Sequence, residues 1–266
     1  MLTEEFHPHL IPLEPDAKIW RYMDLEKFKS LLDRKALFFC RADKFSDPFE
    51  GSIPRKEAEY RLKDAEEKAA LFGRKFDKQS AAQGIEGITF MHLKFKKGMI
   101  INCWHINNNE SDAMWRLYLK DNEGVAIQTN AKRIRQSFVI SNEEIQSSKI
   151  RYINYENDIW FHFNEYPSRN YSFLTPFVHK RIEFNHEQEF RLFHEIHEAI
   201  DDEDYWDTQE KHNGKFIGVD VSTLIEKVWL PPTIDIKAEE RIINMTKDFG
   251  FDFEFSHSKL ESEPYY

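Results

Sequence analysis

The segment NHEQEFRLF carries two carboxylates and a guanidinium within five residues, at Glu187, Glu189 and Arg191. If residues 187–193 form a β-strand, period-two alternation places all three side chains on one face. Two carboxylates about 7 Å apart on one face repel each other, so each requires a cation, a ligand or solvent. The pattern fits a site in which a ligand or a cation meets the two carboxylates. It also fits an exposed sheet face on which Arg191 neutralises its neighbours.

A second set of polar and aromatic residues, Trp20, Arg21 and Tyr22, ends an extended segment that leads into a helix. An arginine at this point can bind a phosphate or a carboxylate through two parallel hydrogen bonds, and a tyrosine can stack or donate a hydrogen bond. A surface arginine beside a half-buried aromatic pair gives the same pattern. Residue types alone favour that second interpretation.

Two carboxylates also flank a Pro-Phe turn, in the run Asp47, Pro48, Phe49, Glu50. They could bind a metal, hydrogen-bond a ribose or cap the following helix. Because Asp before Pro is a common turn former, the turn interpretation is favoured.

Aromatic residues of the segment WHINNNESDAMWRLYLK offer ring surfaces for a ligand. Trp115 and Tyr118 are three residues apart on a predicted helix and share a face, so they could line a pocket. Such a pair is more often part of a core, and His105 alone is more often a structural residue than a catalyst.

The elements that must position these residues follow from apolar spacing and from capping and turn signals. Strands and helices do not alternate regularly, which disfavours a doubly wound parallel sheet. We therefore expect an α+β fold with a strand-rich, mixed or antiparallel core and peripheral helices. The predicted helices are 25–35, 54–75, 113–120, 159–165, 173–177 and 238–248, the predicted strands are 36–42, 99–105, 124–129, 149–155, 189–194, 215–220, 226–230 and 251–255, and loops are expected at 44–51 and 78–87.

The chain of 266 residues is long enough to bury a large core without disulfides or metals. We expect one domain over 1–266. Its core would span 15–256, with a charged helical excursion at 54–83 and peripheral tails at 1–14 and 257–266. The formal net charge of −10 argues against broad binding to a nucleic-acid backbone.

Several features indicate a cytoplasmic protein that does not enter membranes. The N-terminal segment lacks a basic and apolar signal-peptide pattern, and no apolar run reaches the length of about 20 residues that spans a bilayer. The two cysteines, Cys40 and Cys103, lie in apolar runs typical of buried strands, so we predict neither a disulfide nor a metal site. Phosphate-binding glycine loops, HExxH, GxSxG and CxxC patterns are absent from the sequence.

Four segments in order resemble the bacterial domain-of-unknown-function family 2971. They show a Tyr/Arg start, an Asp-Pro-Phe turn, a Met-Trp-x-x-Tyr helix and a Glu-x-Glu-x-Arg strand, and the resemblance runs from about Trp20 to about Pro231. The family name implies no function. The segments are IWRYMDLEKFKSLL, FFCRADKFSDPFEG, INCWHINNNESDAMWRLYLKDNEGVAIQT and HKRIEFNHEQEFRLF.

An arginine ahead of a helix, an aromatic middle and a Glu-x-Glu strand are also similar to the ADP-ribosyltransferase superfamily. That resemblance implies a split sheet and NAD as the substrate, and a toxin or phage-defence effector as the biological role. Arg21 would anchor the cofactor, Glu189 would be the catalytic carboxylate and Glu187 would engage the acceptor. The middle strand departs from the superfamily's Ser-Thr-Ser, with only Thr129 matching. The residues expected to contact the cofactor are Tyr22, Asp47, Phe49, Trp115, Tyr118 and Thr129.

The chemistry suits these residue types, because breaking the glycosidic bond to nicotinamide builds positive charge that a fixed carboxylate stabilises. The acceptor is left open between a protein side chain, a nucleic-acid base and a small molecule. Two alternatives remain at this stage. One is a Mg²⁺-dependent nuclease or phosphoesterase that uses Asp47, Glu50, Glu187 and Glu189. The other is a non-enzymatic module that binds a nucleotide or a partner, with Glu189 away from the groove that holds Arg21.

Overall fold

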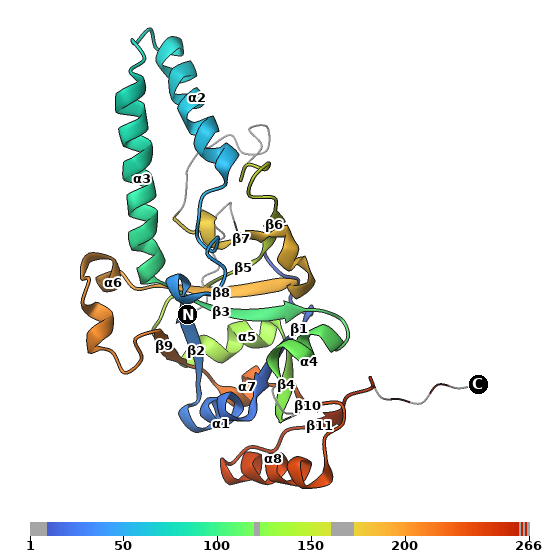
Figure 1. Ribbon diagram of the computed structural model, residues 1–266. Helices are drawn as coiled ribbons and strands as arrows, with labels where there is room; N and C mark the ends of the chain where they lie inside the picture. The colour runs from blue at the N-terminus through green and yellow to red at the C-terminus, as the bar shows by residue number, and fades with distance from the viewer. Residues whose placement is uncertain (1–9, 120–122, 161–172, 261, 263, 265–266) are drawn as a thin grey trace.

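The computed structural model describes residues 10–119, 123–160, 173–260, 262 and 264, and a nine-stranded mixed sheet lies at its centre (Figure 1). One path through the sheet has the order β11-β10-β4-β1-β3-β2-β9, while β8 pairs with both β3 and β5. Among the described pairs of this sheet only β10 and β11 run parallel and the others are antiparallel, so the predicted α+β class is confirmed. The strands are β1 Lys18–Asp24, β2 Ala36–Arg41, β3 Met99–Ile106, β4 Gly124–Asn130, β5 Gln146–Lys149, β8 Glu189–Glu195, β9 Gly214–Gly218, β10 Lys227–Leu230 and β11 Phe255–His257.

Strand β3 has one edge with a single neighbour and one edge shared by two strands, here called the dividing edge. Along the first edge it pairs with β8 from Met99 to His105. On the dividing edge, β2 pairs with the beginning of β3 at Ile100 and Ile101, and β1 pairs with its end at His105 and Ile106. Between these two contacts β1 and β2 separate, because each uses its opposite edge to pair with β4 or β9. A gap therefore opens beside the middle of β3.

The helix that follows β1 forms as its sequence predicts. Asp24 adopts an extended conformation and its side chain accepts a hydrogen bond from the backbone N–H of Lys27, which satisfies a donor of the first turn of α1, Leu25–Arg34. Phe28 and Leu32, one turn apart, are buried in the main core. The other helices are α2 Arg55–Leu71, α3 Lys78–Gly98, α4 Asp112–Tyr118, α5 Ala131–Ser137, α6 Glu198–Asp201, α7 Val221–Leu224 and α8 Ile236–Asp248.

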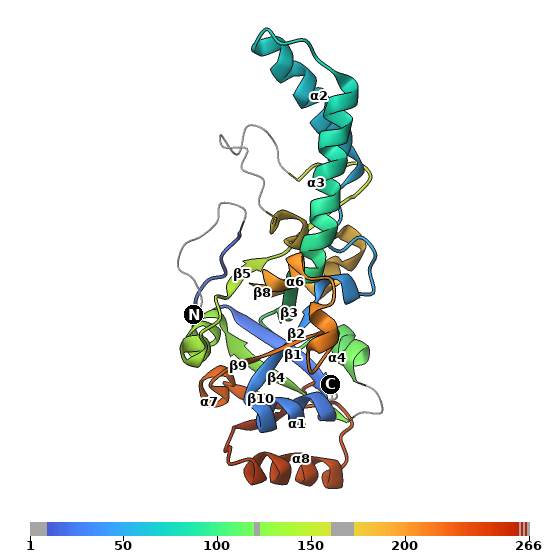
Figure 2. The same ribbon diagram turned by 90° about the vertical axis from the view of Figure 1, so that its left-hand side faces the viewer.

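Helices α2 and α3 form an antiparallel hairpin that projects from the sheet (Figures 1 and 2). The loop predicted at 78–87 is wrong, since this segment begins α3, whose first turn is capped by Asp77 through the N–H of Gln79. Gly84 and Gly87 lower helix propensity and made the segment look like a loop. The excursion is therefore longer than the predicted 54–83.

Other boundaries differ where the chain changes partners. The strand predicted at 149–155 is divided: β5 pairs with β8, and β6, Arg151–Ile153, pairs in parallel with β7, His179–Arg181. The last strand begins at Phe255 rather than at 251, and residues 175–177 form a single 3₁₀ turn. The helix predicted at 159–165 falls mostly outside the described residues. No helix in the described part of the chain has the length and apolar character to cross a bilayer.

Candidate functional site

A cavity of about 490 Å³ lies at the gap between β1 and β2. Its volume is within the range of about 300–1,000 Å³ typical of small-molecule sites. Five of the nine site residues proposed from the sequence line it, and they come from β1, from α4, from the 3₁₀ turn before β8 and from the first position of β8: Arg21, Tyr22, Tyr118, Glu187 and Glu189.

Arg21 is a cation without a carboxylate partner in this cavity. Its Nη1 donates to the backbone carbonyl of Cys103 at 3.0 Å, so the guanidinium occupies the gap where β3 lacks a strand neighbour. The guanidinium carbon lies 5.8 Å from the ring centroid of Trp104. Among the described residues no ion pair to Arg21 is found, and burial lowers its pKa. An anionic ligand group would supply the missing counter-charge.

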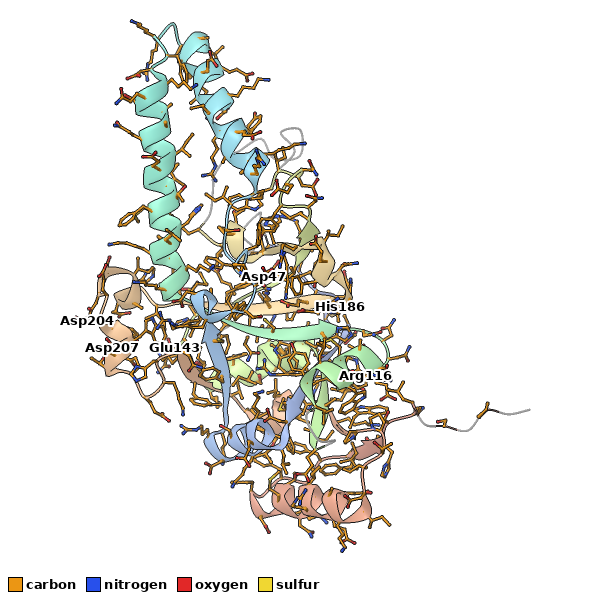
Figure 3. All side chains as sticks on the ribbon, in the orientation of Figure 1. Asp47, Arg116, Glu143, His186, Asp204 and Asp207 are labelled. Atoms are coloured by element: carbon orange, nitrogen blue, oxygen red, sulfur yellow. The ribbon has the colours of Figure 1, made fainter. Side chains whose placement is uncertain are left out.

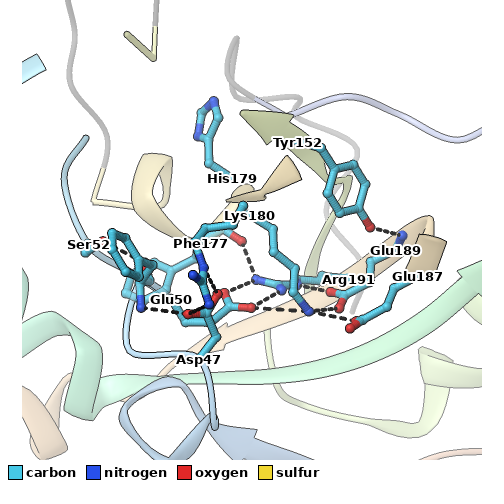
Figure 4. A network of polar contacts seen from close by, with 12 residues as sticks. Asp47, Glu50, Ser52, Tyr152, Phe177, His179, Lys180, Glu187, Glu189 and Arg191 are labelled. Carbon is cyan, nitrogen blue, oxygen red and sulfur yellow. Dashed lines mark hydrogen bonds and ion pairs between the residues drawn. The ribbon is translucent and has the colours of Figure 1, made fainter. Parts of the chain in front are cut away.

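Glu187 and Glu189 are held together by a lysine that the sequence did not suggest (Figure 4). Lys180 Nζ lies 2.7 Å from Glu187 Oε2, 2.7 Å from Glu189 Oε1 and 3.5 Å from Glu50 Oε1. The ammonium group is buried, on β7, between His179 and Arg181 and just after the mostly apolar segment TPFV. The apolar residues ahead of it are the one signal that could have indicated its burial, and a buried lysine needs a partner.

Arg191 completes this cluster beneath the cavity. The guanidinium is fully buried, donates through Nε to Glu189, and forms two parallel hydrogen bonds to Glu50 at 2.8 and 2.7 Å. Its Nη1 also donates to the carbonyl of Phe177 at 3.0 Å. The five side chains Glu50, Glu187, Glu189, Lys180 and Arg191 thus contain three carboxylates and two cations. With all groups ionised, one negative charge is left over.

Glu187 is the carboxylate whose pKa reflects this excess negative charge. Burial and the neighbouring Glu189 raise the pKa of Glu187 to about 7, although Lys180 opposes the shift. Burial also disfavours ionised Glu189, but Arg191 and Lys180 outweigh it and hold the pKa of Glu189 well below its usual range. The two carboxylates therefore differ in role: Glu189 is a permanent anion and Glu187 exchanges a proton near neutral pH.

Their backbone arrangement differs from the sequence expectation. Strand β8 begins at Glu189, while Glu187 ends a 3₁₀ turn and Gln188 adopts the left-handed conformation with φ of 40°. The predicted strand 189–194 is confirmed, but the strand does not extend back to Glu187, which lies in the 3₁₀ turn ahead of it. The side chains still converge because Lys180 contacts both.

Aromatic and polar side chains fix the cavity wall beside the carboxylates. The Tyr22 hydroxyl accepts a hydrogen bond from the backbone N–H of Ser111 at 2.8 Å, and burial raises the Tyr22 pKa. His105 Nδ1 lies 2.6 Å from the carbonyl oxygen of Glu187 and so ties β3 to the turn that carries this acid. Burial raises the pKa of Tyr118 to about 12, which keeps its hydroxyl protonated.

The other four residues proposed from the sequence lie outside the cavity lining. Asp47 pairs with Arg181 at 2.9 Å and lies on the connection between β2 and α2. Strands β3 and β8 separate it from helix α4, on which Arg116 is labelled (Figure 3). Phe49 packs edge-on against Tyr155. Trp115 is buried edge-on against Tyr22, and Thr129 is fully buried in β4. None of these four side chains is among the residues that line the cavity.

The described residues contain no group of three or more His, Cys, Asp or Glu side chains arranged to hold a metal ion. The four carboxylates of the nuclease alternative are instead each in contact with a cation: Asp47 with Arg181, Glu50 with Arg191, and Glu187 and Glu189 with Lys180.

Residues 114–192 match the model of a protein family, DUF2971, described as a protein of unknown function. The match begins in α4 and ends within β8, so it contains Tyr118 and both cavity carboxylates but not Arg21. It is shorter than the resemblance seen in the sequence, which began near Trp20. No curated protein and no solved structure matches the chain, and nothing in these comparisons supports the resemblance to the ADP-ribosyltransferase superfamily.

Proposed function

We propose that this chain is an ADP-ribosyltransferase-like enzyme that binds NAD in the cavity between β1 and β2 and transfers ADP-ribose to an acceptor. One observation carries the proposal: Arg21, which is far in the sequence from Glu187 and Glu189, lines the same cavity as both. Had Arg21 and Glu189 been on opposite sides of the molecule, the idea would have failed.

The charge arrangement supports a role for each group. Arg21, a cation without a carboxylate partner among the described residues, suits the pyrophosphate of the dinucleotide. Glu189 remains ionised and is fixed by Arg191 and Lys180, so it can face the positive charge that develops on the ribose without reorganising.

In the transfer step one bond to ribose C1′ breaks and another forms. The bond between ribose C1′ and the nicotinamide nitrogen breaks, and its electron pair leaves with nicotinamide, whose ring becomes neutral. A lone pair of the acceptor forms the new bond to C1′. The acceptor's proton passes to Glu187, whose pKa of about 7 suits a general base at neutral pH.

The contacts favour this proposal over the two alternatives. A Mg²⁺-dependent nuclease needs its carboxylates free to converge on a metal, whereas Lys180 and Arg191 already contact three of the four. A binding module without chemistry would place Glu189 away from Arg21, but both line one cavity.

The test is release of nicotinamide from NAD by purified protein, with and without EDTA. We expect turnover that EDTA does not affect and that falls about 100-fold or more in Glu189→Gln, by analogy with the loss of one transition-state contact. Glu195→Gln is the matched control, because Glu195 ends the same strand and pairs with His197 outside the cavity lining. Circular dichroism and NAD binding establish that each variant is folded. Turnover unchanged in a folded Glu189→Gln protein contradicts the proposal.

A further inference from the structure

The cavity has a second end, formed by β2, β9 and the outer face of α1, whose chemistry differs from that of the carboxylate end. Phe38 and Phe216 are cross-strand partners in β2 and β9, and their ring centroids are 5.0 Å apart with the planes tilted by 58°. Both rings are partly exposed and both line the cavity. The guanidinium of Arg34 lies 4.4 Å from the Phe216 centroid and holds that ring in place. Such a ring pair offers a surface on which a planar base can stack.

The charged side chains that line this end are two lysines. Lys27 of α1 and Lys211, just ahead of β9, line the cavity and are exposed. Lys27 is paired with Asp24 at 2.8 Å, whereas Lys211 has no ion pair among the described residues; Arg34, beside Phe216, is paired with Glu210 at 2.8 Å. Among the described residues, the carboxylates in the lining are Glu187 and Glu189, at the other end. An aromatic surface flanked by ammonium groups fits a ligand that is both planar and phosphorylated.

Strand spacing gives the separation between the two ends. β8, β3, β2 and β9 are successive neighbours in the sheet, so at ~4.8 Å per strand β8 and β9 are about 14 Å apart. A ligand that reaches Glu189 and also stacks on Phe216 must therefore be extended. Arg21 extends from β1 into the gap beside β3, where it can contact an anion in the middle of such a ligand.

We infer that the β2–β9 end of the cavity is a subsite for a nucleoside 5′-phosphate, which in NAD is the adenosine half. This inference rests on the proposed function for the identity of the whole ligand, but not for binding at the subsite. Asn213 also lines this end, and its exposed amide can donate to and accept from the edge of a base. None of these residues was proposed as a site residue from the sequence.

The experiment is calorimetric titration of the full chain with AMP and, separately, with nicotinamide mononucleotide. We expect AMP to bind, and Lys211→Ala and Phe216→Leu each to weaken AMP binding about tenfold or more while leaving nicotinamide mononucleotide binding within twofold. Lys215→Ala is the matched control, because Lys215 is on β9, pairs with Glu143 and does not line the cavity. Since Lys211 is exposed, its alanine variant is expected to fold normally.

The outcomes separate this inference from the proposed function. AMP binding that depends on Lys211 and Phe216, with no release of nicotinamide from NAD, retains the subsite and rejects the transferase. Nicotinamide release with the same kcat/KM in wild type, Lys211→Ala and Phe216→Leu retains the transferase and rejects the subsite. Failure of AMP to bind, or equal AMP binding in all these proteins, also overturns the inference.

Discussion

Replacing Lys180 by methionine tests the charge balance beneath the cavity. The substitution keeps the length of the side chain but removes the ammonium that lies 2.7 Å from Glu187, 2.7 Å from Glu189 and 3.5 Å from Glu50. Three carboxylates would then share one guanidinium, that of Arg191. Removing one partner of a buried ion pair typically costs about 3–5 kcal/mol of unfolding free energy, because the remaining charge stays buried.

The cost should depend on pH, in a direction set by Glu187. Two unit charges about 4 Å apart interact by about 4 kcal/mol at an effective dielectric constant of 20. Because that attraction favours ionised Glu187, its loss should raise the pKa of Glu187 from about 7 to a higher value. A carboxyl group whose pKa is raised on folding is most favourable to the folded state below its unfolded pKa, and this benefit is lost as pH rises through the folded pKa. The variant should therefore be less impaired at pH 5.5 than at pH 8.5.

The assay is urea unfolding of wild type and Lys180→Met at both pH values, together with the double variant Lys180→Met/Glu187→Gln. The double variant restores the original net charge of the cluster, so we expect it to recover about 1–3 kcal/mol relative to Lys180→Met at pH 8.5. Lys215→Met is the control; its lysine pairs with Glu143 near the surface, and its loss should cost less than about 1 kcal/mol. An equal cost at both pH values, with no recovery in the double variant, would refute the charge balance inferred here.

Two further predictions concern the same site. Nicotinamide release should increase as pH rises through about 7, because Glu187 accepts a proton only when ionised, and the profile should flatten in Glu187→Gln when turnover is measured from pH 5.5 to 8.5. Gly51→Ala should lower unfolding free energy by about 1–3 kcal/mol, because φ is +70° and a Cβ would lie 2.7 Å from the Phe177 ring. Thermal unfolding measures this second effect, and an unchanged midpoint would contradict it.

Much of the fold could be predicted because its signals are local. Asp24 and Ser111 cap α1 and α4 as the sequence indicates, since a short oxygen-bearing side chain ahead of an apolar repeat has few other uses. The strands β2, β3 and β4 are also recognisable locally, because a short apolar run bounded by polar residues is typical of a buried strand. By contrast, α3 has few local signals: its glycines resemble those of a loop, and contact with α2 helps to keep it helical.

The candidate site could be predicted only in part, because pairing of distant strands decides which residues meet. Arg21 and Glu189 were recognised by type and order, and the cavity brings them together. Asp47 and Trp115 also have residue types that suit a ligand, but Asp47 pairs with Arg181 and Trp115 packs against Tyr22. Which partner satisfies a charged or aromatic side chain is a tertiary property. Composition and spacing do not contain it.

The position of the cavity follows from how β3 shares its neighbours. A strand of eight residues that pairs with β8 on one edge, and on the other with β2 at its beginning and β1 at its end, leaves the middle of that second edge without a ladder partner. Buried backbone carbonyls require donors, and here Arg21 donates to the carbonyl of Cys103 while Asn102 donates to that of Phe38. Arg21, whose side chain fills the gap in the sheet, is thus also the cation proposed to contact the pyrophosphate of NAD. Substituting Arg21 would disturb both the sheet and the site, so a change at the exposed Lys211 separates binding from folding more cleanly.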